Sequence, residues 1–246
     1  MVNVFIDGKE GTTGLQIFER LGKRNDVSIV TLPEELRKDP AARKECINGA
    51  DIVFLCLPDA AARESVSLCE NERVRILDAS TAHRTNPAGA YGCPELSKEH
   101  RRRIAEGKRV AVPGCHASGF ISLVYPLIAG GIIAPDYPLV CHSVTGYSGG
   151  GKKMIAEYES EGRSIALDSP RQYALGQAHK HLPEMQAVCG LTYAPSFQPI
   201  VSDYYCGMCV TVPLHVRLMQ KKMGVKELKQ YFAEYYARQN FIKIVE

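Results

Sequence analysis

The sequence predicts an α/β protein whose first half forms a doubly wound parallel sheet, followed by an α+β domain with a mixed or antiparallel sheet. Two observations support this prediction. Short apolar runs alternate strictly with amphipathic stretches up to Cys115, and longer strand-like runs appear only after it. Strict alternation of strand and helix indicates right-handed crossovers between parallel strands.

The first half contains five predicted strands, each a continuous apolar run of the kind buried on both faces. They are Val2–Asp7, Val27–Leu32, Asp51–Leu57, Arg75–Asp78 and Arg109–Val112. Amphipathic segments between them have the pattern of helices. These are Thr13–Gly22, Pro40–Asn48, Ala60–Asn71 and Glu95–Gly107.

The second half begins with an apolar helix, Ser118–Ile128, and adds two amphipathic helices near Lys152–Ser160 and Val225–Gln239. Its predicted strands are Leu139–Thr145, Leu191–Ile200 and Tyr204–Val216, and the last two can form an antiparallel pair. An aromatic stripe on the last helix has core-facing spacing. It consists of Leu228, Tyr231, Phe232, Tyr235 and Tyr236. The simplest division places a domain boundary near residue 115, which gives one domain of residues 1–115 and another of residues 116–246.

Composition excludes several classes of protein. A formal net charge of +3 over 246 residues is too small to indicate a nucleic-acid partner. No apolar run reaches the roughly 20 residues that span a bilayer, so we expect no membrane insertion. The nine cysteines lack disulfide-framework spacing, and the chain opens with a strand rather than a signal peptide. Reduced thiols and a cytoplasmic location are therefore expected.

A glycine-rich turn follows the first predicted strand and opens the first helix. It runs Gly8-Lys9-Glu10-Gly11-Thr12-Thr13-Gly14. Glycines at this point allow a tight turn and a close backbone approach to a pyrophosphate, which the N–H groups of the helix then bind. The position favours nucleotide binding of the Rossmann type, and an ordinary glycine-rich turn is the alternative.

The end of the second strand indicates the cofactor. An NAD site usually carries an acidic residue there for the ribose 2′-hydroxyl, whereas NADP needs cations for its 2′-phosphate. The strand ends in Thr31-Leu32-Pro33 with no acid at its tip, and Arg37-Lys38 follow. NADP is therefore favoured. Glu34 and Glu35 keep NAD open, and a solvated charge run is the alternative reading of the two cations.

Cys115 differs from the other cysteines because Pro113-Gly114-Cys115 joins the fifth strand to a long helix. A thiol at a helix start ionises more readily, and ligands bind at this edge of a parallel sheet. From its position alone, Cys115 is equally well interpreted as a nucleophile or as a buried loop cysteine. Cys46, Cys56 and Cys69 are expected to pack in the core. Cys206-Gly-Met-Cys209 carries no expected metal or redox role because it lies in a strand-like run.

A base for the thiol can come from the segment Gln177–Glu184, which contains His179, His181 and Glu184. A neutral imidazole can take the thiol proton and later protonate an alkoxide, and a carboxylate can orient it. Exposed loop histidines are the alternative. A zinc site of Cys115, His116, His179 and His181 matches no usual zinc spacing, so no metal is expected.

Five segments in this order resemble the N-acetyl-γ-glutamyl-phosphate reductases of arginine biosynthesis, particularly their shorter type. These segments are Gly8–Gly14, Asp78–Arg84, Pro113–Cys115, Gly146–Lys153 and His179–Glu184. The resemblance covers essentially the whole chain. It departs from the family at the end, where members continue into a segment that returns to the nucleotide domain, whereas this chain stops at Phe241–Glu246. A truncated chain is therefore expected.

The resemblance implies a thiolate nucleophile at Cys115 and an acid–base at His181, preferred over His179 because a turn at Pro183-Glu184 follows it directly. Its implied cofactor contacts are Gly8, Gly11, Thr12, Thr13, Gly14, Arg37, Ser80, Thr81 and Gly149. Its implied substrate contacts are Arg84, Ser148, Lys152, His179 and Glu184. Cations for the phosphate are expected among Arg84, Lys152, Lys153 and Arg171, with a solvated surface charge as the alternative for each.

The implied reaction is NADPH-dependent reduction of N-acetyl-γ-glutamyl phosphate to N-acetylglutamate 5-semialdehyde through a cysteine thioester, releasing inorganic phosphate. The second domain is implied to form a homo-oligomer, a dimer or a tetramer. Two alternatives stay open. One is a related semialdehyde dehydrogenase acting on aspartyl phosphate, and the other is an NADP-binding protein without turnover.

Overall fold

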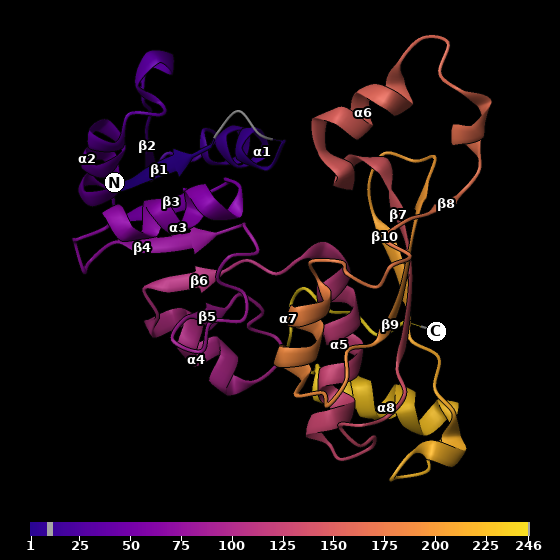
Figure 1. Cartoon of the computed structure of the whole chain (residues 1–246). Helices are drawn as coiled ribbons and strands as arrows, with labels where there is room; N and C mark the ends of the chain where they lie inside the picture. Colours follow the sequence, from indigo (N-terminus) through magenta and orange to yellow (C-terminus); the bar gives the residue numbers. More distant parts are fainter. Residues whose placement is uncertain (9–11, 246) are drawn as a thin grey trace. The chain divides into compact units, whose positions relative to one another are not determined.

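The computed structural model describes residues 1–8 and 12–245, and in it the chain forms two units (Figure 1). The N-terminal unit comprises Met1–Gly92 and Arg102–Pro113, and the C-terminal unit comprises Cys93–Arg101 and Gly114–Glu246. Within the described residues, no helix has the length and apolar character needed to cross a membrane.

A six-stranded parallel sheet with the order β2-β1-β3-β4-β6-β5 forms the N-terminal unit. Its strands are β1 Val2–Asp7, β2 Val27–Val30, β3 Ile52–Leu55, β4 Arg75–Asp78, β5 Ala90–Tyr91 and β6 Arg109–Ala111. The helices are α1 Thr12–Leu21, α2 Pro40–Gly49 and α3 Asp59–Leu68, with a 3₁₀ turn η1 at Glu34–Leu36. Helix α4, Lys98–Glu106, begins in the C-terminal unit and ends in the N-terminal one. The predicted doubly wound fold is confirmed, and the two-residue strand β5 is the element that the sequence analysis missed.

The core of this unit lies where the apolar strands meet α2 and α3. Phe5, Val53, Leu55 and Ile76 come from β1, β3 and β4, and Ile47 from α2; all five are buried. The chain order reverses between β1 and β3, which lie side by side although β2 separates them in sequence. In sheets of this kind, ligands bind outside the carboxyl ends of the strands at such a reversal.

The C-terminal unit contains a four-stranded mixed sheet with the order β10-β7-β9-β8. Its strands are β7 Val140–Gly146, β8 Arg171–Gln172, β9 Ser196–Ser202 and β10 Met208–Thr211. The predicted antiparallel pairing of the last two strands is wrong, because β7 lies between them, parallel to β9 and antiparallel to β10. Both strands are also shorter than predicted from Leu191–Ile200 and Tyr204–Val216.

The reason for this order is the connection from β9 to β10, which crosses the end of β7. Gly146 N–H donates to Gly207 O at 3.0 Å, and Tyr147 N–H donates to Tyr204 O at 3.0 Å. A Cβ on Gly146 would lie 2.5 Å from Tyr204 O, so only glycine allows this close crossing. The crossing delivers β10 to the far side of β7.

The helices of this unit are α5 Cys115–Ala129, α6 Gly151–Glu159, α7 Leu182–Cys189 and α8 Val225–Tyr235. Short 3₁₀ turns are η2 Tyr147–Gly150, η3 Ile165–Asp168 and η4 Val216–Leu218. Helix α7 was not predicted; the segment was interpreted as a turn at Pro183. Pro183 instead occupies the first turn of the helix, where its missing N–H costs nothing, and Gly190 ends the helix with φ +67.

The tyrosines of α8 complete the hydrogen bonding of α5. Pro126 lies inside α5 and has no N–H, so it leaves the carbonyl of Ser122 without its usual intrahelical donor. Tyr236 O–H donates to Ser122 O at 2.6 Å, and Tyr231 O–H donates to Pro126 O at 2.6 Å. The predicted packing of the aromatic stripe is confirmed for Tyr236, which is buried, and its other members are half-buried.

We expect Tyr236→Phe to lower the free energy of unfolding by about 1–2 kcal/mol, because it leaves the Ser122 carbonyl without a donor. Urea denaturation measures this change. The cost should fall in a Pro126→Ala background, where the new N–H satisfies Ser122. Tyr193→Phe, at an exposed tyrosine, is the matched control and should change nothing. An equal cost in both backgrounds would contradict this account of Pro126.

Candidate active site

Cys115 is the first residue of α5, directly after the turn at Pro113 and Gly114, and it is exposed. The first N–H groups of a helix have no partners within it, and their dipoles favour a negative charge. The structure therefore places an accessible sulfur at the positive end of a fifteen-residue helix. Of the two alternatives for this residue, the buried loop cysteine is wrong.

The side chains of His181 and Glu184 pack against the backbone of Gly114, the residue before Cys115. The N–H of Gly114 donates to Glu184 Oε2 at 3.0 Å. A Cβ built on Gly114 would lie 2.4 Å from His181 Nε2 and 2.5 Å from Glu184 Oε1. Only a residue without a side chain allows this approach. Glycine at 114 thus lets an imidazole and a carboxylate lie against the residue that precedes Cys115.

His181 and Glu184 are held there by α7. His181 is the residue before the helix and Glu184 lies in its first turn, so one helical turn separates them. Their exposed fractions are 5% and 1%. The turn that the sequence analysis used to prefer His181 over His179 does not exist. The contact between His181 Nε2 and Gly114 is the structural observation that favours His181.

His179 lies against His181 with ring centroids 4.6 Å apart, and against Phe197 at 5.0 Å. The backbone N–H of His181 donates to His179 Nδ1 at 3.1 Å, so this nitrogen is an acceptor. Burial, with a smaller contribution from Lys180, lowers the pKa of His179. The His179 ring therefore stays neutral near pH 7, with its proton on Nε2.

The loop that carries these histidines is fastened to β9 by Gln177. Its side-chain amide donates to Phe197 O at 2.7 Å and accepts from Phe197 N–H at 2.7 Å, as a neighbouring strand would. Ala174 and Gln177 have φ of +51 and +53, conformations that side chains rarely adopt. The backbone strain is thus held next to the histidines, as is common at functional sites.

His116 and Tyr173 belong to the same cluster, and the sequence analysis did not assign them a place in the chemistry. His116 follows Cys115 and is 3% exposed; its Nδ1 lies 2.7 Å from Ser143 Oγ and its Nε2 2.8 Å from Tyr173 Oη. Burial, and to a lesser degree His179, lowers the pKa of His116 to about 4. Adjacency to Cys115 was the signal that could have found His116, whereas Tyr173 carried none.

No metal site emerges from this cluster. In the part of the chain that the structure describes, no group of three or more His, Cys, Asp or Glu side chains is arranged to hold a metal ion. Both ring nitrogens of His116 already have partners in Ser143 and Tyr173.

Gly8 lines a cavity of about 260 Å³ at the ends of β1 and β2. Gly8 has φ +90, and a Cβ there would lie 2.5 Å from Cys56 O beyond β3. Gly11 lies outside the described residues, and Thr12, Thr13 and Gly14 form the first turn of α1. The apolar wall of the cavity includes Phe5, Phe18, Ile29, Val30, Leu32 and Leu57.

Cations stand at the mouth of this cavity. Arg37 and Lys38 line it beside Glu34, and Arg37 Nε lies 2.8 Å from Glu34 Oε1. Both partners of this ion pair are largely exposed, so it is weak and open to exchange for a stronger anion. The glycine at position 8, the apolar cavity and the two cations together fit a dinucleotide cofactor.

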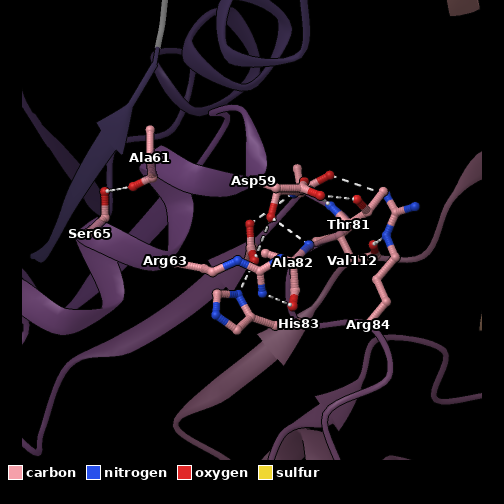
Figure 2. A network of polar contacts seen from close by, with 12 residues as sticks. Asp59, Ala61, Arg63, Ser65, Thr81, Ala82, His83, Arg84 and Val112 are labelled. Carbon is pink, nitrogen blue, oxygen red and sulfur yellow. Dashed lines mark hydrogen bonds and ion pairs between the residues drawn. The ribbon is translucent and has the colours of Figure 1, made fainter. Parts of the chain in front are cut away.

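The predicted residues Ser80, Thr81 and Arg84 follow the carboxyl end of β4. Figure 2 shows Thr81 and Arg84 in the polar network there. Asp78 accepts from Ser80 Oγ at 2.8 Å and lies 2.5 Å from His83 Nδ1, while Asp59 accepts from Thr81 N–H and from its hydroxyl. The two carboxylates thus set the shape of the segment after β4.

Arg84 lies within the N-terminal unit, with its guanidinium directed to main-chain carbonyls (Figure 2). Nε donates to Val112 O at 2.9 Å and Nη2 donates to Ala79 O at 3.2 Å. These bonds tie the segment after β4 to the residue that follows β6. Arg84 therefore shapes the chain just before Pro113 and Gly114.

The remaining predicted residues lie at the end of β7. Ser148 and Gly149 form part of η2, and Lys152 and Lys153 are exposed in the first turn of α6. The guanidinium of Arg171 contacts two residues of α6. Its Nη1 lies 3.4 Å from Glu157 Oε1, and its Nη2 lies 3.1 Å from Tyr158 Oη. The guanidinium carbon also lies 5.2 Å from the centre of the Tyr158 ring. The expectation that Arg171 is available for phosphate is thus not supported by its contacts.

Six of the other eight cysteines are buried or half-buried, whereas Cys115 is exposed. Burial raises the pKa of Cys56 to about 11 and also raises that of Cys46, and both are half-buried rather than fully buried as expected. Cys206 and Cys209 are both exposed free thiols. Exposure alone thus does not single out Cys115; its position at a helix start beside two histidines does.

Comparison with known proteins yields two family models that match the chain. The model described as semialdehyde dehydrogenase, NAD binding domain, matches residues 19–104, and that described as semialdehyde dehydrogenase, dimerisation domain, matches residues 115–246. A protein of Chelativorans sp. (strain BNC1) named N-acetyl-gamma-glutamyl-phosphate reductase is 47% identical over 234 residues, covering 95% of this chain and 75% of that protein. N-acetyl-gamma-glutamyl-phosphate reductase 2 of Pseudomonas putida is 45% identical over 242 residues, covering 98% and 77%.

Solved structures resemble the chain in fold. Aspartate semialdehyde dehydrogenase from Francisella tularensis has a TM-score of 0.68 at 12% identity, covering 96% of this chain and 81% of that chain. Aspartate semialdehyde dehydrogenase II from Vibrio cholerae has a TM-score of 0.68 at 13% identity, covering 94% and 78%. At such low identity this likeness confirms the two-part α/β fold and no more.

We expect Gly114→Ala to reduce turnover on the order of 100-fold, because the new Cβ displaces His181 and Glu184 from the residue beside Cys115. Steady-state kinetics on the purified variant measure the loss. Gly49→Ala is the matched control, since a Cβ there meets nothing within 4 Å, and it should keep full activity. Equal rates for the two variants would show that the contact at Gly114 has no role.

Proposed function

The chain belongs to the N-acetyl-γ-glutamyl-phosphate reductase family, and we propose that it reduces N-acetyl-γ-glutamyl phosphate to N-acetylglutamate 5-semialdehyde with NADPH. The observation that carries this proposal is the packing of His181 Nε2 and Glu184 against Gly114, beside an exposed Cys115. A nucleophile, a base and an orienting carboxylate are the groups that thioester chemistry requires.

In the proposed reaction the Cys115 thiolate attacks the acyl carbon, the carbon–oxygen bond to phosphate breaks, and a thioester forms as inorganic phosphate leaves. The N–H groups at the start of α5 are placed to stabilise the oxyanion, which is worth about 3–4 kcal/mol per donor in other enzymes. Bound nicotinamide supplies the hydride that reduces the thioester. His181 protonates the resulting oxygen and then accepts that proton as the hemithioacetal collapses to aldehyde and thiolate.

The roles of individual residues are part of the proposal. Cys115 is the nucleophile and His181 the acid–base, while Glu184 orients the site from its buried position against Gly114. We assign cofactor binding to the glycine turn, Arg37 and three further residues. The complete set is Gly8, Gly11, Thr12, Thr13, Gly14, Arg37, Ser80, Thr81 and Gly149. We assign substrate binding to Arg84, Ser148, Lys152, His179 and Glu184, with Arg84 acting through the segment that it ties down.

NADP is the proposed cofactor because Arg37 and Lys38 line the cavity at the end of β2, and the tip of that strand carries no acid. We further propose residues 1–115 as the dinucleotide-binding domain and residues 116–246 as the catalytic and self-association domain of a dimer or tetramer. The family model described as a dimerisation domain supports the second assignment. Free thiols at all nine cysteines support a location in the reducing cytoplasm.

A second candidate is a semialdehyde dehydrogenase that acts on aspartyl phosphate. The two matching family models, both described as semialdehyde dehydrogenase domains, support it. The substrates of the two candidate enzymes differ in the acetamido group. A comparison of turnover with the two aldehydes therefore separates the candidates. An NADP-binding protein without turnover is the third candidate.

Run in reverse, the reaction gives a direct assay. The chain mixed with NADP, phosphate and N-acetylglutamate 5-semialdehyde should produce NADPH, followed by absorbance. Cys115→Ser should abolish the signal because it removes the thiolate, whereas Cys206→Ser, at another exposed cysteine, should retain it. Faster turnover of aspartate semialdehyde would favour the second candidate. Binding of NADP with no turnover of either aldehyde would favour the third.

Arg37→Ala should weaken the binding of NADPH about tenfold and leave the binding of NADH unchanged, because it removes one charge-assisted contact to the 2′-phosphate. Calorimetric titration with both cofactors measures the two affinities. Arg24→Ala, at an exposed arginine paired with Asp26, should affect neither. A preference for NADH in the unmodified chain would instead assign the ribose contact to the acidic residues beside Arg37.

A further inference from the structure

We propose that Arg43 is a positioning residue for cofactor binding, which holds the Asp7 carboxylate and cancels its charge at the wall of the cofactor cavity. The inference rests on the proposed function, because that function requires an anionic dinucleotide in the cavity that Gly8 lines. It follows from a buried ion pair at the end of β1, whose last residue lines the same cavity.

Three hydrogen bonds converge on one oxygen of Asp7. Arg43, on α2, donates to Asp7 Oδ2 from Nε at 3.3 Å and from Nη2 at 3.1 Å. Ser65, on α3, donates to the same oxygen from Oγ at 2.8 Å and accepts from Arg43 Nη2 at 2.6 Å. Charge-assisted hydrogen bonds of this kind are strong, and together they fix the orientation of the carboxylate.

This ion pair is almost completely buried. The side chains of Arg43 and Asp7 are 7% and 5% exposed, and Ser65 is fully buried. Taking two charges out of water is costly, and replacement of such a pair by well-packed apolar side chains is often neutral or stabilising. A contribution to stability alone therefore does not explain why charged residues occupy these positions.

The position of the pair in the sheet indicates a further role. Asp7 is the last residue of β1, and its carbonyl accepts from Cys56 N–H at 2.8 Å. Gly8 follows with φ +90, so close to the Cys56 carbonyl that no side chain fits there. Asp7 and Gly8 line the same cavity as Arg37 and Lys38. The charge of Asp7 thus lies in the wall of the cavity to which we assign the dinucleotide.

An acid in this wall opposes the binding of an anion, because like charges repel more strongly near a protein surface than in bulk water. Within residues 1–8 and 12–245, Arg43 is the one cation in ion-pair contact with Asp7. Its Nη1 also lies 3.2 Å from Glu64 Oε2, but the Glu64 side chain is 48% exposed and water screens it. Arg43 therefore removes most of the repulsion that Asp7 would exert on a phosphate.

The experiment measures the affinity of the full chain for NADP by calorimetric titration. Arg43→Gln leaves the Asp7 charge unbalanced and should weaken binding about fivefold. Asp7→Asn leaves the Arg43 charge unbalanced and should tighten binding by a similar factor. The variant with both substitutions restores the balance and should bind NADP as the unmodified chain does.

A purely structural role gives a different result. If the pair only held β1, α2 and α3 together, both single variants would weaken binding, and that outcome would overturn the proposal. Asp7→Asn is decisive even where Arg43→Gln does not fold, because Arg43 keeps its contacts with Ser65 and Glu64. Unchanged or weaker binding by Asp7→Asn with a native circular dichroism spectrum would contradict the inference.

Lys44→Gln is the matched control. Lys44 is the next residue of α2 and pairs with Glu70 on the surface, where the two side chains are 43% and 70% exposed. The control removes one positive charge, as Arg43→Gln does, but leaves the buried pair intact. Its affinity for NADP should equal that of the unmodified chain. An equal loss in both variants would reveal an effect of net charge alone and would also overturn the proposal.

The same titration separates this inference from the proposed function. Binding of NADP by the unmodified chain, with both single variants weakened, rejects the inference and leaves the proposed function intact. The expected opposite changes in a chain that reduces no acyl phosphate would support the inference and reject the proposed reaction. No binding of NADP by the unmodified chain would contradict both.

Discussion

The close approach at Gly114 is the constraint on which the site depends. The buried carboxylate of Glu184 accepts a hydrogen bond from the Gly114 N–H. The imidazole of His181 and this carboxylate lie so close to Gly114 that a Cβ there would clash with both. This contact joins the start of α5 to the start of α7. Because Cys115 follows directly, the same glycine that permits the turn also determines which groups surround the sulfur.

Burial organises the chemistry around that sulfur. His116 and His179 have lowered pKa values because they are buried among aromatic rings, so each ring is neutral and can accept or pass a proton. Cys115 itself is exposed and reachable by a substrate. The N-terminal unit contains an apolar cavity that Gly8 and Arg37 line.

The sequence predicted the N-terminal sheet closely because its strands are continuous apolar runs whose order follows from right-handed crossovers. The second sheet was predicted less well, since the position of β10 depends on a crossing at Gly146 that no local pattern reveals. Helix α7 was missed because Pro183 was interpreted as a turn, although proline is common in a first helical turn. Cys115, His181 and Glu184 were identifiable by residue type and motif. Tyr173 was not, because its partner His116 is 57 residues away in the chain.

The central claim is that Cys115 carries the acyl group, and trapping that group tests it most directly. With N-acetylglutamate 5-semialdehyde and NADP but no phosphate, the reverse reaction should stop at the thioester, because the phosphate that accepts the acyl group is absent. The account predicts a burst of NADPH stoichiometric with the chain and an N-acetylglutamyl adduct on the peptide that contains Cys115. A burst with the adduct on another cysteine, or with no adduct on any, would contradict it.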